Sequence, residues 1–252
     1  MPYVLKKKVA DAAILTSMLY SSESWLTDNL QKIERHYHAM IKILLGVRNT
    51  TANLLCLAEA GFAELSVLVR ERRTKFLLSK LTNPDIDEPF IVVYNLCRNN
   101  NTHGYKFCEA TMTNPSTSNT VAMKCEKYST SRTKFATYME LNPQLTVHSM
   151  YSNPLIPEHQ RIATTRFRLS SHNLLVEKLR WSRVPREQRL CPCNRWSIQD
   201  EYHVVNECQK SEICREKFKN TLTFPKPLYE LFNKDNNNNV CEFIFMLTCQ
   251  YQ

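Results

Sequence analysis

The scarcity of glycine restricts what this chain can fold into more than any other feature of its sequence. Three glycines, Gly46, Gly61 and Gly104, stand among 252 residues that include 11 prolines. Tight turns in β-proteins and loops that cradle phosphates both depend on glycine, which adopts backbone conformations that other residues avoid. Neither a phosphate-binding loop nor a dinucleotide-binding fingerprint can be assembled from these three positions. Since 43% of the residues are hydrophobic, the chain can still bury a core, and we predict an all-α fold.

Apolar residues recur at helical intervals through the N-terminal third of the chain. This spacing predicts four helices, over residues 3–20, 28–45, 49–60 and 63–81. Gly46 and Gly61 would end the second and third of these helices, because glycine readily takes the left-handed conformation that follows a helix. The first two helices would form a helical hairpin.

The remainder of the chain is less regular. Residues 98–131 are polar and show the least periodicity, so we expect a linker there. Two short helices between residues 158 and 184 carry most of the charge, a helix over residues 200–220 follows, and an apolar helix closes the chain. The expected regions are therefore a helical region over 1–97, a poorly defined linker with helices over 98–155, basic helices with a Cys/His cluster over 156–220, and C-terminal helices over 221–252.

The stretch RLCPCNRWSIQDEYHVVNEC concentrates potential metal ligands. Its pattern C-x-C-x9-H-x4-C is formed by Cys191, Cys193, His203 and Cys208. Thiolate and imidazole are the donors that zinc prefers, and four of them close a tetrahedral structural site. Such a site has no open position for water, so it would stabilise the fold and would not catalyse. Chance clustering among ten cysteines and seven histidines is the alternative, and Cys214 is a candidate substitute ligand.

The two halves of this cluster are expected to differ in local structure. Cys191 and Cys193 flank a tight turn, after which Asn194 would adopt a left-handed backbone conformation. His203 and Cys208 would lie in the first turns of the helix over residues 200–220.

Positive charge is concentrated in one window of the chain. The formal net charge is +9, and residues 161–195 alone hold nine basic and two acidic residues, a net charge of +7. A local excess of this kind is typical of proteins that bind polyanions, because each basic side chain that neutralises a phosphate releases counterions. We therefore expect RNA or DNA as a partner, with contacts from Arg161, Arg166, Arg168, Lys178, Arg180, Arg183, Arg186 and Arg189. A solvated basic face or a nuclear-import patch is the alternative.

Cysteine usage and hydropathy bear on where the protein works. Most of the ten cysteines are scattered singly, and the N-terminal sequence MPYVLKKKVADAAIL lacks the residue order of a signal peptide. We therefore expect free thiols in a reducing compartment, the nucleus or the cytoplasm. No apolar run reaches the roughly 18 residues of a membrane span, so we expect no membrane partner.

Other signals for chemistry are weak. Asp85, Asp87 and Glu88 lie between prolines, which favours a solvated turn over an acid–base pair. His172 stands near a predicted helix start, where capping is more common than catalysis. Phe167 and Trp181 are interleaved with the arginines. They could stack on bases, although aromatic residues at helical spacing are more often buried in a core.

Several short motifs occur in a fixed order along the chain. The first part contains MLYSSESW, IKILLGVRNTT and LAEAGFAELSVLVRERRTKF, and the second contains RFRLSSHNLLVEKLRWSRVPREQRLCPCN followed by DEYHVVNEC. In order and spacing these motifs resemble the thumb, post-polymerase and zinc-knuckle segments of non-LTR retrotransposon (LINE-type) reverse transcriptases. The resemblance covers most of residues 10–82 and 158–218.

The resemblance implies a role for each matched segment. Residues 4–20 and 28–45 would be thumb helices, and the zinc-knuckle positions of the family fall on the four Cys/His residues named above. Ser21 replaces a glycine of the family's pattern, so the backbone bend at that position is in question.

The resemblance also bears on catalysis. Nucleotidyl transfer needs two metal ions held by aspartates, and the chain contains no Asp-Asp pair. The chain would therefore correspond to a C-terminal part of the enzyme without the palm, and would not be an enzyme by itself. Its partners would be RNA or DNA and the upstream palm and fingers of the same polyprotein.

Three alternatives remain at this point. The chain could be an exapted retrotransposon remnant that acts as a protein-interaction module, with the basic patch serving nuclear import. It could be an independent nuclease or other hydrolase, which would require convergent carboxylates. It could also be a truncated element from which no functional protein is made.

Overall fold

The computed structural model describes residues 2–25, 29–82, 88–113, 120–232 and 237–251. Throughout these ranges the regular secondary structure is helical, and the only β-pairing is an isolated bridge between Leu190 and Ile198. The predicted all-α fold is thereby confirmed. Within the same ranges, every helix is too short or too polar to cross a lipid bilayer.

The chain divides into two compact units, each assembled from non-contiguous segments. Unit 1 comprises Met1–Lys8, His38–Phe62 and Ala122–Gln252, and unit 2 comprises Val9–Tyr37 and Ala63–Val121. These units do not coincide with the four consecutive regions expected from the sequence. An apolar pattern indicates which side chains are buried, but it does not indicate which distant segment buries them.

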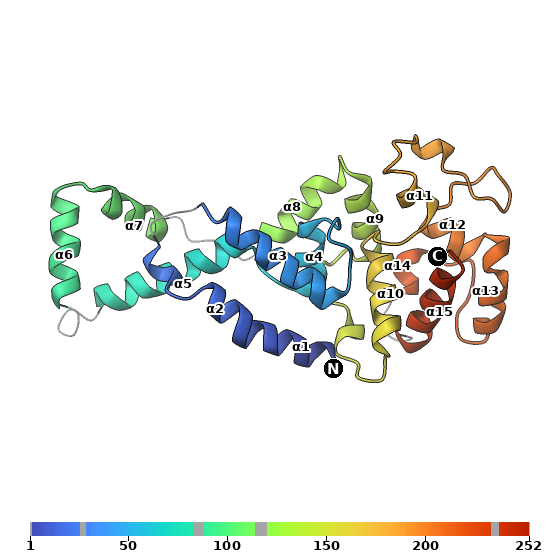
Figure 1. Cartoon of the computed structure of the whole chain (residues 1–252), viewed down its shortest axis with the longest axis horizontal. Coiled ribbons are helices and arrows are strands. Elements are labelled where there is room, and N and C mark those ends of the chain that lie inside the picture. Colours follow the sequence, from blue (N-terminus) through green and yellow to red (C-terminus); the bar gives the residue numbers. More distant parts are fainter. Residues whose placement is uncertain (1, 26–28, 83–87, 114–119, 233–236, 252) are drawn as a thin grey trace. The chain divides into compact units, whose positions relative to one another are not determined.

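The helices of the N-terminal half include a π-helical segment, η1, and a 3-10 turn, η2. In chain order they are α1 (Tyr3–Val9), η1 (Ala10–Leu15), α2 (Thr16–Met18), η2 (Ser22–Ser24), α3 (Gln31–Leu45), α4 (Asn53–Ala60), α5 (Leu65–Thr82), α6 (Glu88–Asn99) and α7 (His103–Thr113) (Figure 1).

The helices of the C-terminal half are interspersed with short 3-10 turns. In chain order they are α8 (Thr120–Ser129), α9 (Thr133–Leu141), η3 (Ser149–Tyr151), α10 (Glu158–Arg168), α11 (Leu175–Lys178), η4 (Arg186–Gln188), α12 (Glu201–Asn206), η5 (Gln209–Ser211), α13 (Glu212–Phe218), α14 (Leu228–Leu231) and α15 (Asn237–Cys249).

Two glycines end helices as predicted. Gly46 follows α3 with a φ of +69°, and Gly61 follows α4 with a φ of +66°. Side chains are also excluded there by close packing. A Cβ on Gly46 would lie 2.8 Å from Cγ1 of Ile162, and one on Gly61 would lie 2.4 Å from Cγ2 of Val147.

Two predicted segments differ from the structure. The helix expected over residues 3–20 is interrupted by the π-helical η1, and residues 26–28, where the second helix was expected to begin, lie outside the described residues. Residues 98–131, where the least periodic part of the linker was expected, contain all of the helices α7 and α8.

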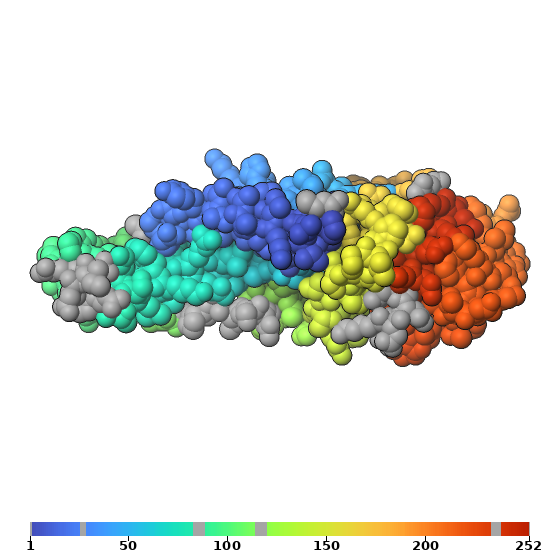
Figure 2. All heavy atoms as spheres, turned by 90° about the horizontal axis from the view of Figure 1, so that it is seen from below, coloured from blue at the N-terminus to red at the C-terminus, as the bar shows by residue number. Residues whose placement is uncertain are grey.

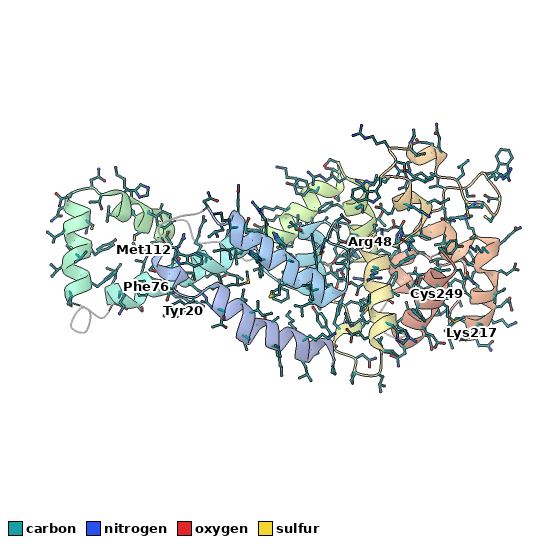
Figure 3. All side chains as sticks on the ribbon, viewed as in Figure 1. Tyr20, Arg48, Phe76, Met112, Lys217 and Cys249 are labelled. Carbon is teal, nitrogen blue, oxygen red and sulfur yellow. The ribbon has the colours of Figure 1, made fainter. Side chains whose placement is uncertain are left out.

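Unit 2 is organised around α5. This helix contacts η2, α6 and α7. The Arg73 guanidinium lies over the Phe107 ring of α7, 4.7 Å from its centroid, and Phe76, labelled in Figure 3, meets Phe90 of α6 edge to face at 5.9 Å. These contacts explain why α7 forms in a stretch of weak periodicity, since an aromatic side chain and a distant arginine stabilise it.

Ser21 adopts the left-handed backbone conformation that glycine takes more readily than other residues. Its φ is 55° and its ψ is 21°, immediately before η2. The backbone bend that was in question therefore exists with serine at this position.

Unit 1 has its main core where α10 packs against α15. The two helices lie side by side in Figure 1, and the yellow segment of α10 adjoins the red segment of α15 in the space-filling view of Figure 2. The buried face of α15 follows the i, i+3, i+4, i+7 spacing of an amphipathic helix, with Val240, Phe243, Ile244 and Leu247. Lys217 of α13, labelled in Figure 3, adds an ion pair with Glu242 of α15 at 2.8 Å.

Candidate metal centre and basic surface

The structure brings the four predicted ligands together. One ligand atom from each of Cys191, Cys193, His203 and Cys208 lies within 4.8 Å of all the others. The Sγ atoms of Cys191 and Cys208 are 3.6 Å apart, and Sγ of Cys193 is 3.3 Å from Nε2 of His203. These residues could therefore hold a metal ion, as their sequence spacing predicted.

A tight loop positions the first two cysteines. The backbone N–H of Cys191 donates to the carbonyl of Ser197 at 2.7 Å, and the Leu190–Ile198 bridge continues this pairing. At the tip, Oδ1 of Asn194 accepts hydrogen bonds from the backbone of Trp196 and Ser197, each at 3.1 Å.

The left-handed residue of this loop is Arg195, with a φ of 59°, and not Asn194 as expected. The Asn194 side chain closes the turn through its own hydrogen bonds, a role that asparagine fills in many turns. The strained backbone conformation therefore falls on the next residue.

The other two ligands belong to a broken helix. Oδ1 of Asp200 caps α12 by accepting from the backbone N–H of His203 at 3.0 Å. The helix ends at Asn206, and Cys208 lies beyond it, where its N–H donates to the carbonyl of His203 at 2.8 Å. The prediction of a single helix over residues 200–220 is therefore wrong, because α12 ends before Cys208. The turn that follows α12 brings Cys208 close to His203.

Polar groups around the cluster orient three of its ligands. Tyr251 donates its hydroxyl to Sγ of Cys208 at 3.1 Å, and Gln199 donates Nε2–H to Sγ of Cys191 at 3.4 Å. Nδ1 of His203 lies 3.1 Å from a carboxylate oxygen of Glu207, which leaves Nε2 to face the sulfurs. Partners of this kind fix ligand orientation in metal sites. Neither Tyr251 nor Gln199 was singled out in the sequence, because Gln199 occupies an unspecified position of the ligand pattern and Tyr251 lies beyond it.

The thiols of the cluster have strongly divided pKa values. Burial raises the pKa of Cys193 to about 12, assisted by hydrogen bonds with Cys191 and Cys208. Burial also acts to raise the pKa of Cys208, but hydrogen bonds, first that from Tyr251, outweigh it and bring the pKa to about 7. The Cys208 thiol therefore ionises before the Cys193 thiol, since neighbouring sulfur anions repel one another, and a bound cation would weaken that repulsion.

Cys214, the candidate substitute ligand, takes a structural place instead. It is buried in the main core of unit 1 together with Phe218 and Phe243. Burial raises the pKa of its thiol. A buried thiol among aromatic side chains behaves as a small apolar residue.

Two of the predicted nucleic-acid contacts are buried, so the structure does not present them to a phosphate. Arg168 is 1% exposed and forms a bidentate pair with Glu59, with Nε 2.7 Å from Oε1 and Nη2 3.0 Å from Oε2. Arg161 is also buried, with its guanidinium 5.1 Å from the centroid of the Tyr3 ring. The sequence shows their charge but not these distant partners.

The other six predicted contacts reach the surface to different extents. Arg166, Lys178, Arg180 and Arg183 are exposed, and Arg195, which was counted in the basic window, is exposed as well. Arg186 is partly exposed and pairs with Asp200 at 3.0 Å. Arg189 is partly buried and donates to the backbone carbonyls of Val176 and Val184, so it fixes the loop.

The segment around α11 that carries Lys178, Arg180 and Arg183, here called the basic segment, is hydrogen-bonded to the loop that carries Cys191 and Cys193, here called the metal loop. Gln199 accepts from the N–H of Leu175 through Oε1 at 2.9 Å, and its carbonyl accepts from Val176 at 3.3 Å. Arg189 adds the contact with the carbonyl of Val176 at 2.6 Å. The loop that carries Cys191 and Cys193 thus fixes the position of α11.

His172 has a local structural role. Its Nδ1 accepts from the N–H of Leu174 at 3.3 Å, and its Nε2 lies 2.8 Å from a carboxylate oxygen of Glu201. Ser170 donates to the same oxygen at 3.0 Å, so its hydroxyl is bonded to the carboxylate and not to the imidazole. This arrangement links the end of α10 to the start of α12 and lacks the nucleophile–base contact of a hydrolase. Asp85 and Asp87 lie outside the described residues.

Aromatic residues of the basic window divide between core and surface. Phe167 is fully buried, whereas Trp181 is 66% exposed. Trp196, which the sequence did not single out, is 87% exposed at the tip of the metal loop.

A scan against models of protein families and searches of curated proteins and of solved structures found no match. The resemblance to LINE-type reverse transcriptases therefore stays a prediction, which rests on the sequence motifs.

Proposed function

We propose that Cys191, Cys193, His203 and Cys208 bind one structural zinc ion. In a tetrahedral zinc site, bonds of about 2.3 Å to sulfur and about 2.0–2.1 Å to nitrogen put two sulfurs roughly 3.8 Å apart and a sulfur and a nitrogen roughly 3.6 Å apart. The corresponding distances here are 3.6 and 3.3 Å, which supports this assignment. A set of three sulfurs and one imidazole also favours zinc over magnesium or calcium, which prefer oxygen ligands.

Elemental analysis of the purified protein tests this proposal. We expect one equivalent of zinc, which is lost in Cys193→Ser together with order in residues 189–208. Cys249→Ser is a matched control, since Cys249 is an exposed cysteine at the end of α15 (Figure 3), and it should keep the metal. A wild-type chain that folds without any metal would contradict the proposal.

We infer that the chain binds RNA or DNA through phosphate contacts from the exposed side chains of Arg166, Lys178, Arg180 and Arg183. The observation that carries this inference is the placement of Lys178, Arg180 and Arg183 on a segment that the metal loop fixes through Gln199 and Arg189, while Arg166 is exposed on α10. A rigid basic segment loses less conformational entropy on binding a phosphate backbone than a flexible one does. The zinc ion would thus hold the basic surface in place and would take no part in a chemical reaction.

The salt dependence of binding tests the nucleic-acid function. The affinity for mixed-sequence RNA or single-stranded DNA should fall steeply as salt is added, with a slope of log K against log salt of roughly −0.7 for each phosphate neutralised on a single strand. Reversing Arg166, Lys178, Arg180 and Arg183 to glutamate should abolish binding and flatten the slope. The matched control reverses four exposed lysines outside the window, Lys8, Lys75, Lys127 and Lys219, and should retain most of the affinity. Equal losses of affinity in both variants would mean that binding depends on the total positive charge and not on these four side chains.

We further propose that the chain acts as the C-terminal, non-catalytic part of a LINE-type reverse transcriptase, in the nucleus or the cytoplasm, together with a palm and fingers from the same polyprotein. The ordered motifs support this proposal, as does the absence of an Asp-Asp pair from the sequence. The purified chain should show no incorporation of deoxynucleotides on a primed RNA template. In-frame upstream sequence that encodes a Tyr/Phe-x-Asp-Asp turn would support the assignment, and polymerase activity of the chain alone would refute it.

A protein-interaction module is the second candidate. Three aliphatic side chains of α6, Val92, Val93 and Leu96, are each more than half exposed, and such side chains are typical of surfaces that bind a protein partner. This function predicts that Val93→Asp abolishes binding of the protein partner, whereas the four charge reversals leave that binding intact. The opposite result favours nucleic-acid binding.

A further inference from the structure

A hollow on unit 1 brings together three segments that are far apart in the sequence. Its lining includes Thr50 from the segment before α4, Arg132, Lys134 and Phe135 from the start of α9, and Arg180 and Trp181 from the segment after α11. The volume is about 350 Å³. Pockets for small ligands measure about 300–1,000 Å³, so this one has the size for a single small group and not for a double helix.

The lining of the hollow carries an excess of positive charge. Lys134 and Arg180 both approach the carboxylate of Glu177, at 2.5 and 3.5 Å. In the described part of the chain, Arg132 forms no ion pair, and its guanidinium is stacked on the Tyr128 ring, 4.2 Å from the centroid. Three cations thus line the hollow and one carboxylate pairs with two of them, so the remaining positive charge favours an anion in the hollow.

Two aromatic side chains give the hollow an apolar side. Phe135 is buried, while Trp181 exposes two thirds of its surface beside Arg180. An exposed indole next to guanidinium groups offers both a face for stacking and a charge for a phosphate. This combination is typical of sites that bind unpaired nucleotides, because every base has a π-face and every nucleotide a phosphate.

We propose that this hollow binds one unpaired nucleotide of a bound strand, with the base stacked on Trp181 and the phosphate held by Arg132 and Arg180. The proposal rests on the proposed nucleic-acid function and adds to it a preference for single strands. In a duplex both faces of a base are covered by neighbouring bases, so a paired base cannot reach the indole. The basic surface alone would attract single and double strands alike.

Binding measurements with the full, zinc-loaded chain test the proposal. The probes are a labelled oligouridylate and an RNA duplex, each titrated at several salt concentrations. Trp181→Ala should weaken binding of the single strand by about 5- to 150-fold, the range that the loss of one stacked base produces. Trp181→Phe should retain most of the affinity, and neither variant should change the affinity for the duplex. Arg132→Gln should reduce the salt slope for the single strand by about 0.7.

Trp196→Ala is the matched control. Trp196 is the more exposed of the two tryptophans, at 87%, and does not line the hollow, so its replacement should leave the affinity close to that of the wild type. Circular dichroism and zinc content establish that each variant is folded. In a Trp25→Phe, Trp196→Phe background, the remaining Trp181 fluorescence should be quenched by the oligouridylate and not by the duplex.

The outcomes separate the two proposals. If single strands bind with a steep salt dependence but Trp181→Ala and Arg132→Gln equal the wild type, the nucleotide site is wrong and the phosphate-binding function stands. Equal weakening by Trp181→Ala and Trp196→Ala would also overturn the site. If no nucleic acid binds even at low salt, the proposed function fails and the site fails with it.

Discussion

At the scale of single residues, the buried pair of Glu59 and Arg168 has the largest expected effect on stability. Both side chains are almost inaccessible to water, and the hydroxyls of Tyr138 and Tyr151 donate to the Glu59 carboxylate at 2.9 and 3.0 Å. Burial acts to raise the pKa of Glu59, but the Arg168 guanidinium and its hydrogen bonds, with that from Tyr138, outweigh it and lower the pKa. A charge that is so fully paired is stable only while its partner is present.

Replacement of Arg168 by methionine should therefore destabilise the protein severely. We expect a loss of about 3–5 kcal/mol in the free energy of unfolding, because the Glu59 carboxylate would remain buried without a counter-charge. The double variant Glu59→Gln, Arg168→Met should recover much of this loss. Lys178→Ala, at an exposed position of the basic window, should change stability by no more than about 0.5 kcal/mol. Urea unfolding monitored by circular dichroism measures all three variants.

The lowered pKa of Glu59 also predicts a pH dependence. A carboxyl group whose pKa is lower in the folded state stabilises the protein above its unfolded-state pKa, about 4.3, and this stabilisation is lost as the pH falls further through the folded-state value. The free energy of unfolding should thus decrease between pH 5 and pH 3, as measured by urea unfolding. The decrease should be smaller in Glu59→Gln, Arg168→Met, and identical slopes in both proteins would assign the effect to other groups.

At the scale of elements, two of the three glycines act as helix ends and the third does not. Gly46 and Gly61 have positive φ angles and close neighbours, whereas Gly104 lies in α7. Substitution of glycine by alanine should therefore lower the stability of the protein at the helix ends and raise it at Gly104.

Gly46→Ala should destabilise the protein by about 1–2 kcal/mol from the backbone conformation alone. The cost rises further because the new Cβ would displace Ile162. Gly104→Ala should instead stabilise by up to about 0.5–1 kcal/mol, since alanine favours the helical backbone more than glycine does. Thermal unfolding of the two variants checks both signs, and a stabilised Gly46→Ala would contradict the packing at the end of α3.

Sequence patterns predicted what depends on neighbouring residues. The scarcity of glycine predicted the fold class, helical periodicity predicted individual helices, two glycines placed the ends of α3 and α4, and the ligand spacing identified a cluster that assembles in space. Partners far along the chain could not be predicted. The pairing of Arg168 joins residues 109 positions apart, and the helix α7 depends on the contact of Phe107 with Arg73. The end of α12 before Cys208 was not predicted, because helical periodicity does not indicate where the chain must turn to bring four ligands together.

At the scale of the whole molecule, the metal cluster connects to the end of the chain through Tyr251. This residue follows α15, and its hydroxyl contacts both Cys208 and Ser211. The C-terminal helix, the metal loop and the basic segment therefore form one connected structure within unit 1.

Tyr251→Phe should lower the zinc affinity by about tenfold, because a donor to a ligating sulfur would be lost while the ring remains in place. Competition with a chromogenic chelator measures the change. Tyr229→Phe is the control, since Tyr229 is an exposed tyrosine of α14 whose hydroxyl contacts Glu230. Equal zinc affinities of Tyr251→Phe and the wild type would mean that this hydroxyl does not support the cluster.

The pairing of α10 with α15 also has a consequence for synthesis on the ribosome. The helix α10 ends at Arg168, and the partner face of α15 extends to Leu247. At about 5–20 residues per second, roughly 4–16 s separate the synthesis of these two points. During this interval α10 has no α15 to pack against. A nascent chain with such an exposed apolar face is a natural client for chaperones that bind near the tunnel exit, and slow codons between α10 and α15 would prolong that dependence.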